Sequence, residues 1–325
     1  MPSRAHTPQS PHAPPAPRAV AHLVPSDARG GAYVALASAL TAGGVALAAR
    51  GGAPAWAAGQ VLIALATVQW FCLLHEAGHH ALFASSAANR VAGHVAGCAA
   101  LIPFRTWRLV HAGHHRWTGW QDRDATTAAL APRARGRLER ALANAAWRSG
   151  FPLFSLAYRW NNFWNAHRVE RFFAGEGARA RNAALGLACV YAALALAVGP
   201  LVLARLVGVG LLLGLALQDP LILSQHTHLP MPCAAQREVR PLSAAQQARY
   251  TRSLAFPAWI GRGLLCGVGE HERHHAFPRV PGYLLHRVPW TPPRRVGAWR
   301  FLRAARRLSG ARLLFENAET TGFRL

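Results

Sequence analysis

Residues 55–80 read AWAAGQVLIALATVQWFCLLHEAGHH, in which an apolar run leads directly into a histidine cluster. Its apolar part, residues 55–74, has the ~20-residue length that a helix needs to cross the hydrocarbon core of a bilayer. The first five letters of HEAGHH match HExxH, the zinc motif of metalloproteases, whereas the sixth letter adds a third histidine. The kind of metal site therefore depends on the rest of the chain.

Three more apolar stretches, residues 32–49, 183–204 and 206–224, also have about the length of a membrane span. Of the 325 residues, 52% are hydrophobic and only 15% are charged, which is too apolar for an ordinary soluble domain. We therefore expect an all-α integral membrane protein with about four transmembrane helices. A helical, histidine-rich cap is predicted to consist of residues 75–181 and 225–325.

The formal net charge of +23 comes from arginine, since the chain contains no lysine. The arginines lie between the apolar runs instead of forming one stripe, so no nucleic-acid partner is expected. The positive-inside rule accounts for them better, because it keeps arginine-rich loops in the cytoplasm. We expect the cap to face the cytoplasm, at a bacterial inner membrane. Residues 1–30, rich in Pro and Ala, are predicted to be a disordered tail that precedes one membrane domain, residues 31–325.

Eleven of the seventeen histidines fall in four short clusters. Residues at i, i+3 and i+4 share one face of a helix, so each HxxHH motif aims three imidazoles at one point. Two spans precede the first cluster and two more precede the third, which brings all four clusters to the same side of the membrane. The candidate metal ligands are His75, His79 and His80, then His111, His114 and His115, then His226 and His228, and finally His271, His274 and His275.

The number of histidines favours two metal ions. One tetrahedral zinc needs only three or four protein ligands, whereas two metals that each keep an open position for dioxygen would use nine or ten. Zinc has no redox chemistry and iron activates oxygen, so a two-iron site fits best. A membrane zinc protease that uses HEAGH with Asp219 as a further ligand is the distant alternative, and it leaves HAGHH, QHTH and HERHH unexplained.

HEAGHH, HAGHH followed by RWTGWQDRDAT, QHTHLP and HERHHAFPRVPGY resemble the histidine boxes of the membrane fatty acid desaturase family, over roughly residues 30–290. The resemblance implies a non-haem diiron centre, dioxygen as co-substrate and a lipid acyl chain as substrate. It also implies an external electron donor of the ferredoxin, rubredoxin or cytochrome b5 type. The expected reaction is the introduction of a double bond into a fatty acyl chain. Hydroxylases or ketolases of a lipid, alkane or carotenoid share these boxes and remain alternatives.

Two finer expectations concern the surroundings of the metals. Carboxylates beside the clusters are candidates to hydrogen-bond ligand imidazoles. His226 and His228 would face about 200° apart on a continuing helix, so only one of them should reach the metals. The family's lone histidine after a span matches His226 best, whereas His228 precedes Leu229-Pro230 and is expected to turn toward the interface. The carboxylate candidates are Glu76, Asp122, Asp124, Glu270 and Glu272.

Overall fold

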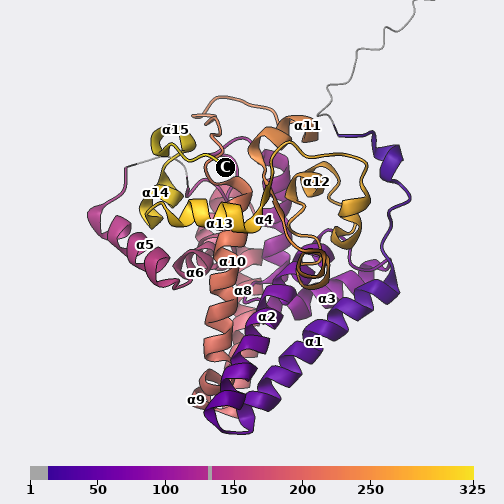
Figure 1. Cartoon of the computed structure of the whole chain (residues 1–325), viewed down its shortest axis with the longest axis vertical. Helices are drawn as coiled ribbons and strands as arrows, with labels where there is room; N and C mark the ends of the chain where they lie inside the picture. The colour runs from indigo at the N-terminus through magenta and orange to yellow at the C-terminus, as the bar shows by residue number, and fades with distance from the viewer. Residues whose placement is uncertain (1–13, 131–133) are drawn as a thin grey trace, which may run out of the picture.

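Four long apolar helices form a stalk, and shorter elements form a cap at one end of it (Figure 1). The computed structural model describes residues 14–130 and 134–325. All four stalk helices are long and apolar enough to cross a membrane, which confirms the predicted all-α membrane fold. They are α1 (Asp27–Ala49), α2 (Ala53–Gly78), α8 (Gly177–Val198) and a fourth span, Pro200–His226, made of α9 (Pro200–Leu203), the π-helical turn η3 (Ala204–Gly208) and α10 (Val209–His226).

The turn between the third and fourth spans lies earlier in the chain than predicted. Gly199 has a φ of 91°, a conformation that glycine adopts easily, and Pro200 then occupies the first turn of the next helix. Arg205, near which the sequence suggested the boundary, lies inside the fourth span, and its carbonyl accepts a hydrogen bond of 2.9 Å from the Trp56 indole. The predicted spans 183–204 and 206–224 are therefore shifted in their bounds but correct in number.

Small residues let the spans approach closely. A Cβ added to Gly59 of α2 would lie 2.6 Å from the carbonyl oxygen of Gly44 in α1, and one added to Gly214 of α10 would lie 2.6 Å from Thr67 of α2. Gln60 then satisfies backbone groups around the π-helical turn. Its amide donates to the Leu206 carbonyl at 2.8 Å and accepts from the Gly210 N–H at 2.7 Å. These contacts fix the spans relative to one another in the part of the stalk that lies away from the cap.

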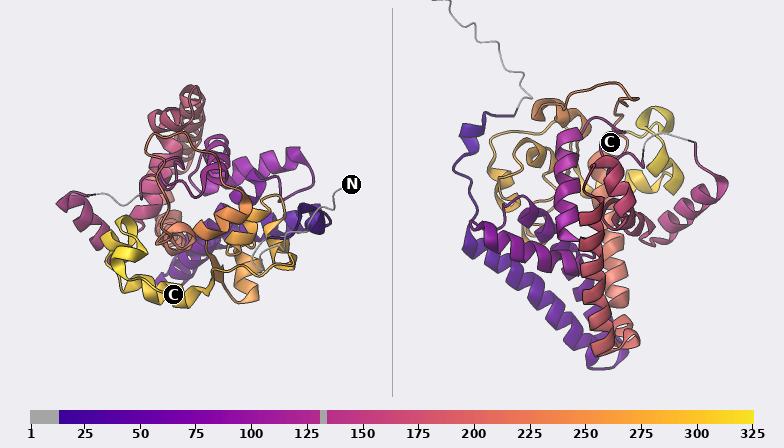
Figure 2. Two further views of the ribbon diagram at one scale, coloured as in Figure 1. Left: turned by 90° about the horizontal axis from the view of Figure 1, so that it is seen from above. Right: turned by 180° about the vertical axis from the view of Figure 1, so that it is seen from behind.

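The cap is built from the segment between α2 and α8 and the segment after α10, which lie side by side over one end of the stalk (Figure 2). β1 (Ser253–Ala255) and β2 (Arg295–Gly297) pair in parallel, with Ser253 opposite Arg295. The first segment contains α3 (Ser86–Ala99), α4 (Phe104–Trp117), α5 (Arg137–Ser149), α6 (Leu153–Arg159), η2 (Trp160–Trp164) and α7 (Ala166–Phe172). The second contains α11 (Ala244–Gln247), η4 (Ala248–Tyr250), η5 (Trp259–Leu264), α12 (His271–Ala276), η6 (Gly282–Arg287), α13 (Ala298–Arg306), α14 (Gly310–Phe315) and α15 (Ala318–Thr321).

The predicted disordered tail, residues 1–30, falls only partly within the described residues, because residues 1–13 lie outside them. From residue 14 onward the chain packs against the rest of the molecule. Val20 and Leu23 are buried in the core, and the N–H of Ser26 donates to the Tyr283 hydroxyl at 2.9 Å. A short helical turn, η1 (Pro17–Val20), precedes α1. The packed part of the chain therefore begins earlier than the predicted boundary.

Candidate metal centre

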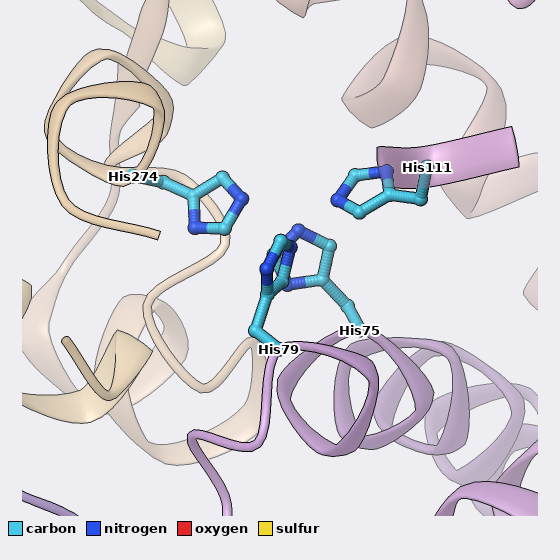
Figure 3. A group of neighbouring side chains, drawn as sticks. All are labelled: His75, His79, His111 and His274. Atoms are coloured by element: carbon cyan, nitrogen blue, oxygen red, sulfur yellow. The ribbon is translucent and has the colours of Figure 1, made fainter. Parts of the chain in front are cut away.

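Four helices bring their histidines to one place at the cap end of the stalk. The last turn of α2 carries His75, and His79 caps that helix. The end of α10 carries His226. Figure 3 shows how His75 and His79 of the α2 end, His111 of α4 and His274 of α12 point their rings toward one another from different elements. The histidines of α4 are His111, His114 and His115, and those of α12 are His271, His274 and His275.

Eight of these side chains form two groups of four. In each group the four potential ligand atoms lie within 4.8 Å of one another. The ninth histidine, His115, lies between the groups, since its Nε2 is 3.1 Å from that of His111 and 2.9 Å from that of His274, while its ring centroid is 4.5 Å from that of His275. We call His75, His79, His111 and His274 the first group, and His114, His226, His271 and His275 the second group.

Two of the eleven candidates, His80 and His228, lie apart from the two groups and from His115. Each has a φ of 56°, so the helical path that aims the neighbouring imidazoles inward is broken at these positions. His80 follows the end of α2 and is half-buried. His228 is buried, and its ring packs against Phe323 with centroids 4.8 Å apart. The geometry thus brings nine of the eleven predicted histidines together, with His226 among them.

Two of the five predicted carboxylates hydrogen-bond rings of the groups. An oxygen of Glu76 lies 3.0 Å from Nδ1 of His75, and its other oxygen accepts the N–H of Gly282 at 2.6 Å. Asp124 lies 2.7 Å from Nδ1 of His114, and its second oxygen accepts from the N–H and the hydroxyl of Thr126, both at 2.9 Å. Each carboxylate is therefore fixed on one side while it orients a ring on the other.

The other three carboxylates form their hydrogen bonds and ion pairs elsewhere among the described residues. Asp122 accepts the backbone N–H groups of Ala234 and Ala235. Glu270 pairs with Arg273 and Arg295. Glu272 accepts the N–H of Arg294 at 2.9 Å, and burial raises the pKa of its carboxyl to about 6.

Two further contacts to the histidines come from residues that the sequence did not single out. The amide oxygen of Gln247 lies 3.0 Å from Nδ1 of His275, while its amide nitrogen donates to the His115 carbonyl at 2.8 Å. The backbone carbonyl of Tyr250 accepts from Nδ1 of His226 at 2.8 Å. Both partners come from the short segment α11–η4, far in sequence from every histidine box, and a backbone carbonyl leaves no trace in a side-chain pattern.

The rings present their nitrogens to one another. Burial, together with the charge of neighbouring imidazoles, lowers the pKa of His111, His115 and His271 well below the usual range. Where Nδ1 donates outward, the Nε2 lone pair faces inward, and Nε2 atoms of His226 and His271 are 2.9 Å apart. Four rings, those of His75, His114, His226 and His275, have Nδ1 bonded to an outward oxygen, which leaves their Nε2 lone pairs free to bind metal ions.

Two neighbouring cavities lie on one side of the groups. The smaller, of about 50 Å³, is lined by five of the histidines together with Phe71 and Trp107, whose ring stacks on His111 with centroids 4.3 Å apart. The larger, of about 600 Å³, lies among α5, α6 and α14 and has a largely apolar lining. The two cavities are next to each other, because five residues line both of them. These are Thr126, Leu130, Phe154, Tyr158 and Leu223.

Comparisons with known proteins agree with this arrangement. A family model described as fatty acid desaturase matches residues 52–295, well over half of the chain. The endoplasmic reticulum omega-3 fatty acid desaturase of Vigna radiata var. radiata is 26% identical over 67% of this chain and 60% of its own length. The chloroplastic sn-2 acyl-lipid omega-3 desaturase (ferredoxin) of Helianthus annuus is 24% identical over 67% of this chain and 52% of its own. The sn-1 oleoyl-lipid 12-desaturase of a Picosynechococcus strain is 33% identical, but over only 19% of this chain and 18% of its own. The matched part of this chain thus spans between about half and three fifths of the two plant relatives.

Proposed function

The chain belongs to the fatty acid desaturase family, and we propose that it is a membrane-bound, dioxygen-dependent oxidoreductase that introduces a double bond into a fatty acyl chain. The observation that carries the proposal is the pair of four-histidine groups beside an apolar cavity of about 600 Å³. This volume lies within the range of about 300–1,000 Å³ that is typical of small-molecule pockets.

Two irons would occupy the two groups, with His115 available to either of them. Bound iron would supply the electron transfer and the dioxygen chemistry that removal of hydrogen from an unactivated methylene requires. A zinc protease has less support. Both oxygens of Glu76, its required base, are already hydrogen-bonded, and Asp219 accepts from the N–H of Ser155 instead of joining the histidines.

The protein's own part is to hold the rings and the acyl chain in fixed positions. Outward hydrogen bonds from Nδ1 to Glu76 and Asp124 fix the orientation of His75 and His114 and leave Nε2 pointing inward. Phe154 and Tyr158 line both cavities, so they would lie against the part of the chain nearest the metals. Placement there decides which hydrogens come within reach, because small displacements change the rate of an oriented reaction strongly.

The distribution of arginine supports a cap that faces the cytoplasm of a bacterial inner membrane. Of the arginines in residues 14–130 and 134–325, only Arg50 and Arg205 lie at the end of the stalk opposite the cap. A cap with this charge would also attract an acidic electron carrier of the ferredoxin, rubredoxin or cytochrome b5 type. The name of the Helianthus annuus relative includes ferredoxin.

The experiment is expression in a bacterial host, followed by mass spectrometry of the fatty acid methyl esters. A new unsaturated acid is expected, and it should be absent from a host that expresses a His271→Ala variant. A hydroxy acid in its place would indicate a hydroxylase, and altered carotenoids would indicate a ketolase. An unchanged lipid profile, with iron-loaded protein present in the membrane, would contradict the proposal.

A further inference from the structure

Three exposed arginines surround the half-buried ring of His80 at the cap end of α2. They come from three separate elements, since Arg90 lies on α3, Arg108 on α4 and Arg279 in the loop after α12. Burial lowers the pKa of the His80 ring, and the charges of these three guanidinium groups lower it further, so all three lie close to the ring. Within residues 14–130 and 134–325, none of them forms an ion pair with a carboxylate. We call Arg90, Arg108 and Arg279 the arginine patch, a surface whose positive charge is not compensated.

The arginine patch borders the first histidine group. His80 directly follows His79, and Arg108 lies three residues before His111, on the same side of α4. His79 and His111 are half-buried, whereas three of the four histidines in the second group are buried. The first group is thus the more exposed of the two, and its exposed edge, formed by His79 and His111, lies beside the patch.

The proposed reaction needs electrons from outside the protein. When one dioxygen removes two hydrogens from a pair of methylenes, the products are a double bond and two waters, and two electrons and two protons must be supplied. A one-electron carrier is oxidised in each encounter, so it has to dock twice for each double bond. Electron transfer between proteins slows steeply with distance. The carrier must therefore bind where ligand rings lie close to the surface.

We infer that an acidic electron-carrier protein docks on the arginine patch and delivers its electrons at the exposed edge of the first group. The inference rests on the proposed function and names the surface that its redox partner uses. The charge of the whole cap attracts an acidic protein from many directions, which raises the rate of encounter. The arginine patch then selects the orientation in which the carrier faces His79, because complementary charges fix the register of a complex.

Another set of exposed arginines offers a matched comparison. Arg300, Arg303 and Arg307 lie on α13 or at its end, and none of them forms an ion pair among the described residues. α13 contributes no histidine to either group. Figure 1 and the view from above in Figure 2 both show it apart from α3. These three residues therefore have the charge of the arginine patch without its position beside the first group.

The first test is a cross-link that needs neither iron nor turnover. Because the chain contains no lysine, an introduced lysine is the only side-chain amine in the protein. Arg279→Lys and its control Arg303→Lys both keep the positive charge. Each full-length variant, in phosphatidylcholine nanodiscs, is mixed with an oxidised plant-type ferredoxin and treated with a carbodiimide, which joins carboxylates to amines in contact with them. A cross-linked product is expected with Arg279→Lys and not with Arg303→Lys.

Two results of the cross-linking experiment would overturn the inference. The first is an equal yield, or no product, with the two variants. The second is a product with Arg279→Lys that disappears when phosphatidylglycerol replaces part of the phosphatidylcholine, since this would show that lipid phosphates occupy the arginine patch.

The second test measures turnover of iron-loaded protein with reduced ferredoxin and oxygen. One variant replaces all three arginines of the patch by glutamine, and the control variant does the same at Arg300, Arg303 and Arg307, so both lose the same charge. The KM for ferredoxin should rise by about tenfold or more in the patch variant, and its dependence on salt should become weaker. The control variant should keep the KM of the unaltered protein. Equal KM values in the two variants, at equal iron content, would overturn the inference.

A small reductant separates the docking surface from the reaction itself. Dithionite with a small uncharged mediator supplies electrons without docking, so the ratio of ferredoxin-driven to mediator-driven product should fall in the patch variant only. An unchanged ratio in the patch variant would overturn the inference and leave the proposed function standing. If the unaltered, iron-loaded protein forms no product with either electron source, the proposed function is overturned, and the inference with it.

Discussion

The two histidine groups are alike in their inward geometry and differ in what holds the rings from outside. In the first group only His75 hydrogen-bonds outward, to Glu76, among the residues that the structure describes. In the second group three of the four rings do so, to a carboxylate, a backbone carbonyl and a side-chain amide. These pairs are His114–Asp124, His226–Tyr250 and His275–Gln247.

This difference indicates that the two groups bind their metal ions with different strength. Outward hydrogen bonds fix ring orientation before a metal arrives and raise the basicity of the ligand. The second group is therefore the more preorganised site, and we expect it to hold its iron more tightly. The first group, whose other three rings are held mainly by packing, is the site more able to change its ligand arrangement. It should release its iron first when a chelator is added.

The largest effect is expected from the pair His226 and His228, which are two residues apart and have opposite surroundings. His226→Ala removes a ring from the second group, and the remaining imidazoles cannot close the vacancy. This variant should lose the iron of that group and all product. His228→Ala removes a ring that packs on Phe323 and should keep iron and activity. Metal analysis and product formation in detergent-purified protein check both variants, and loss of iron in His228→Ala alone would reverse the assignment.

Asp124 and Asp122 provide the next comparison. Asp124→Asn removes the charge that orients His114 and should weaken iron binding in the second group by about 10- to 100-fold. Asp122→Asn alters a carboxylate that accepts only backbone N–H groups in the described residues, and should leave iron binding unchanged. Chelator-induced iron release, followed by absorbance, should show a slow phase that becomes fast in Asp124→Asn only. If both variants release iron at the same rate, the Asp124 carboxylate does not act through His114.

A smaller effect is expected at Gln247, because a neutral amide orients a ring less strongly than a carboxylate does. Gln247→Ala should weaken iron binding in the second group by about tenfold and leave the first group unaffected. Arg249→Ala, at an exposed neighbour two residues later, is the matched control. The same chelator assay distinguishes the groups. Faster iron release from the first group in Gln247→Ala would contradict the assignment of Gln247 to the second group.

The smallest effect is expected from pH, and it should not discriminate between the groups. Burial lowers the pKa of rings in both, including His111 of the first and His271 of the second. The unfolded chain therefore binds protons below about pH 6.5 that the folded, metal-free protein does not, and stability is lost as the pH falls through this range. Thermal unfolding of metal-free protein should occur at a lower temperature at pH 5.5 than at pH 7.5. A pH-independent unfolding temperature would show that the rings are not held neutral.

Much of this arrangement could be predicted from the sequence, because helical spacing is a local property. The apolar runs indicated four spans, and the HxxHH spacing placed three rings on one face of α4 and of α12. The exclusion of His80 and His228 could not be predicted with the same rule, since each lies where a positive φ ends the helical path. Position near a histidine box also failed to identify ring partners for Asp122, Glu270 and Glu272, whose described partners are backbone N–H groups or arginines.

The outward hydrogen bonds by which the second group differs from the first were the least predictable from the sequence. Glu76 and Asp124 stand close to a box in the sequence and could be singled out as candidates. Gln247 and the Tyr250 carbonyl reach the second group only because α11 and η4 fold back over α12. Their position depends on packing between segments distant in the sequence, which carries no local pattern.

The metal content of the purified protein tests the two-iron centre most directly. Iron-supplemented, detergent-purified protein should contain close to two irons per chain by elemental analysis, since each four-histidine group offers one site. Because overproduced protein can take up the wrong metal, zinc by itself would not decide the matter. Stoichiometric zinc at one ion per chain, together with peptidase activity that depends on Glu76, would contradict the two-iron centre.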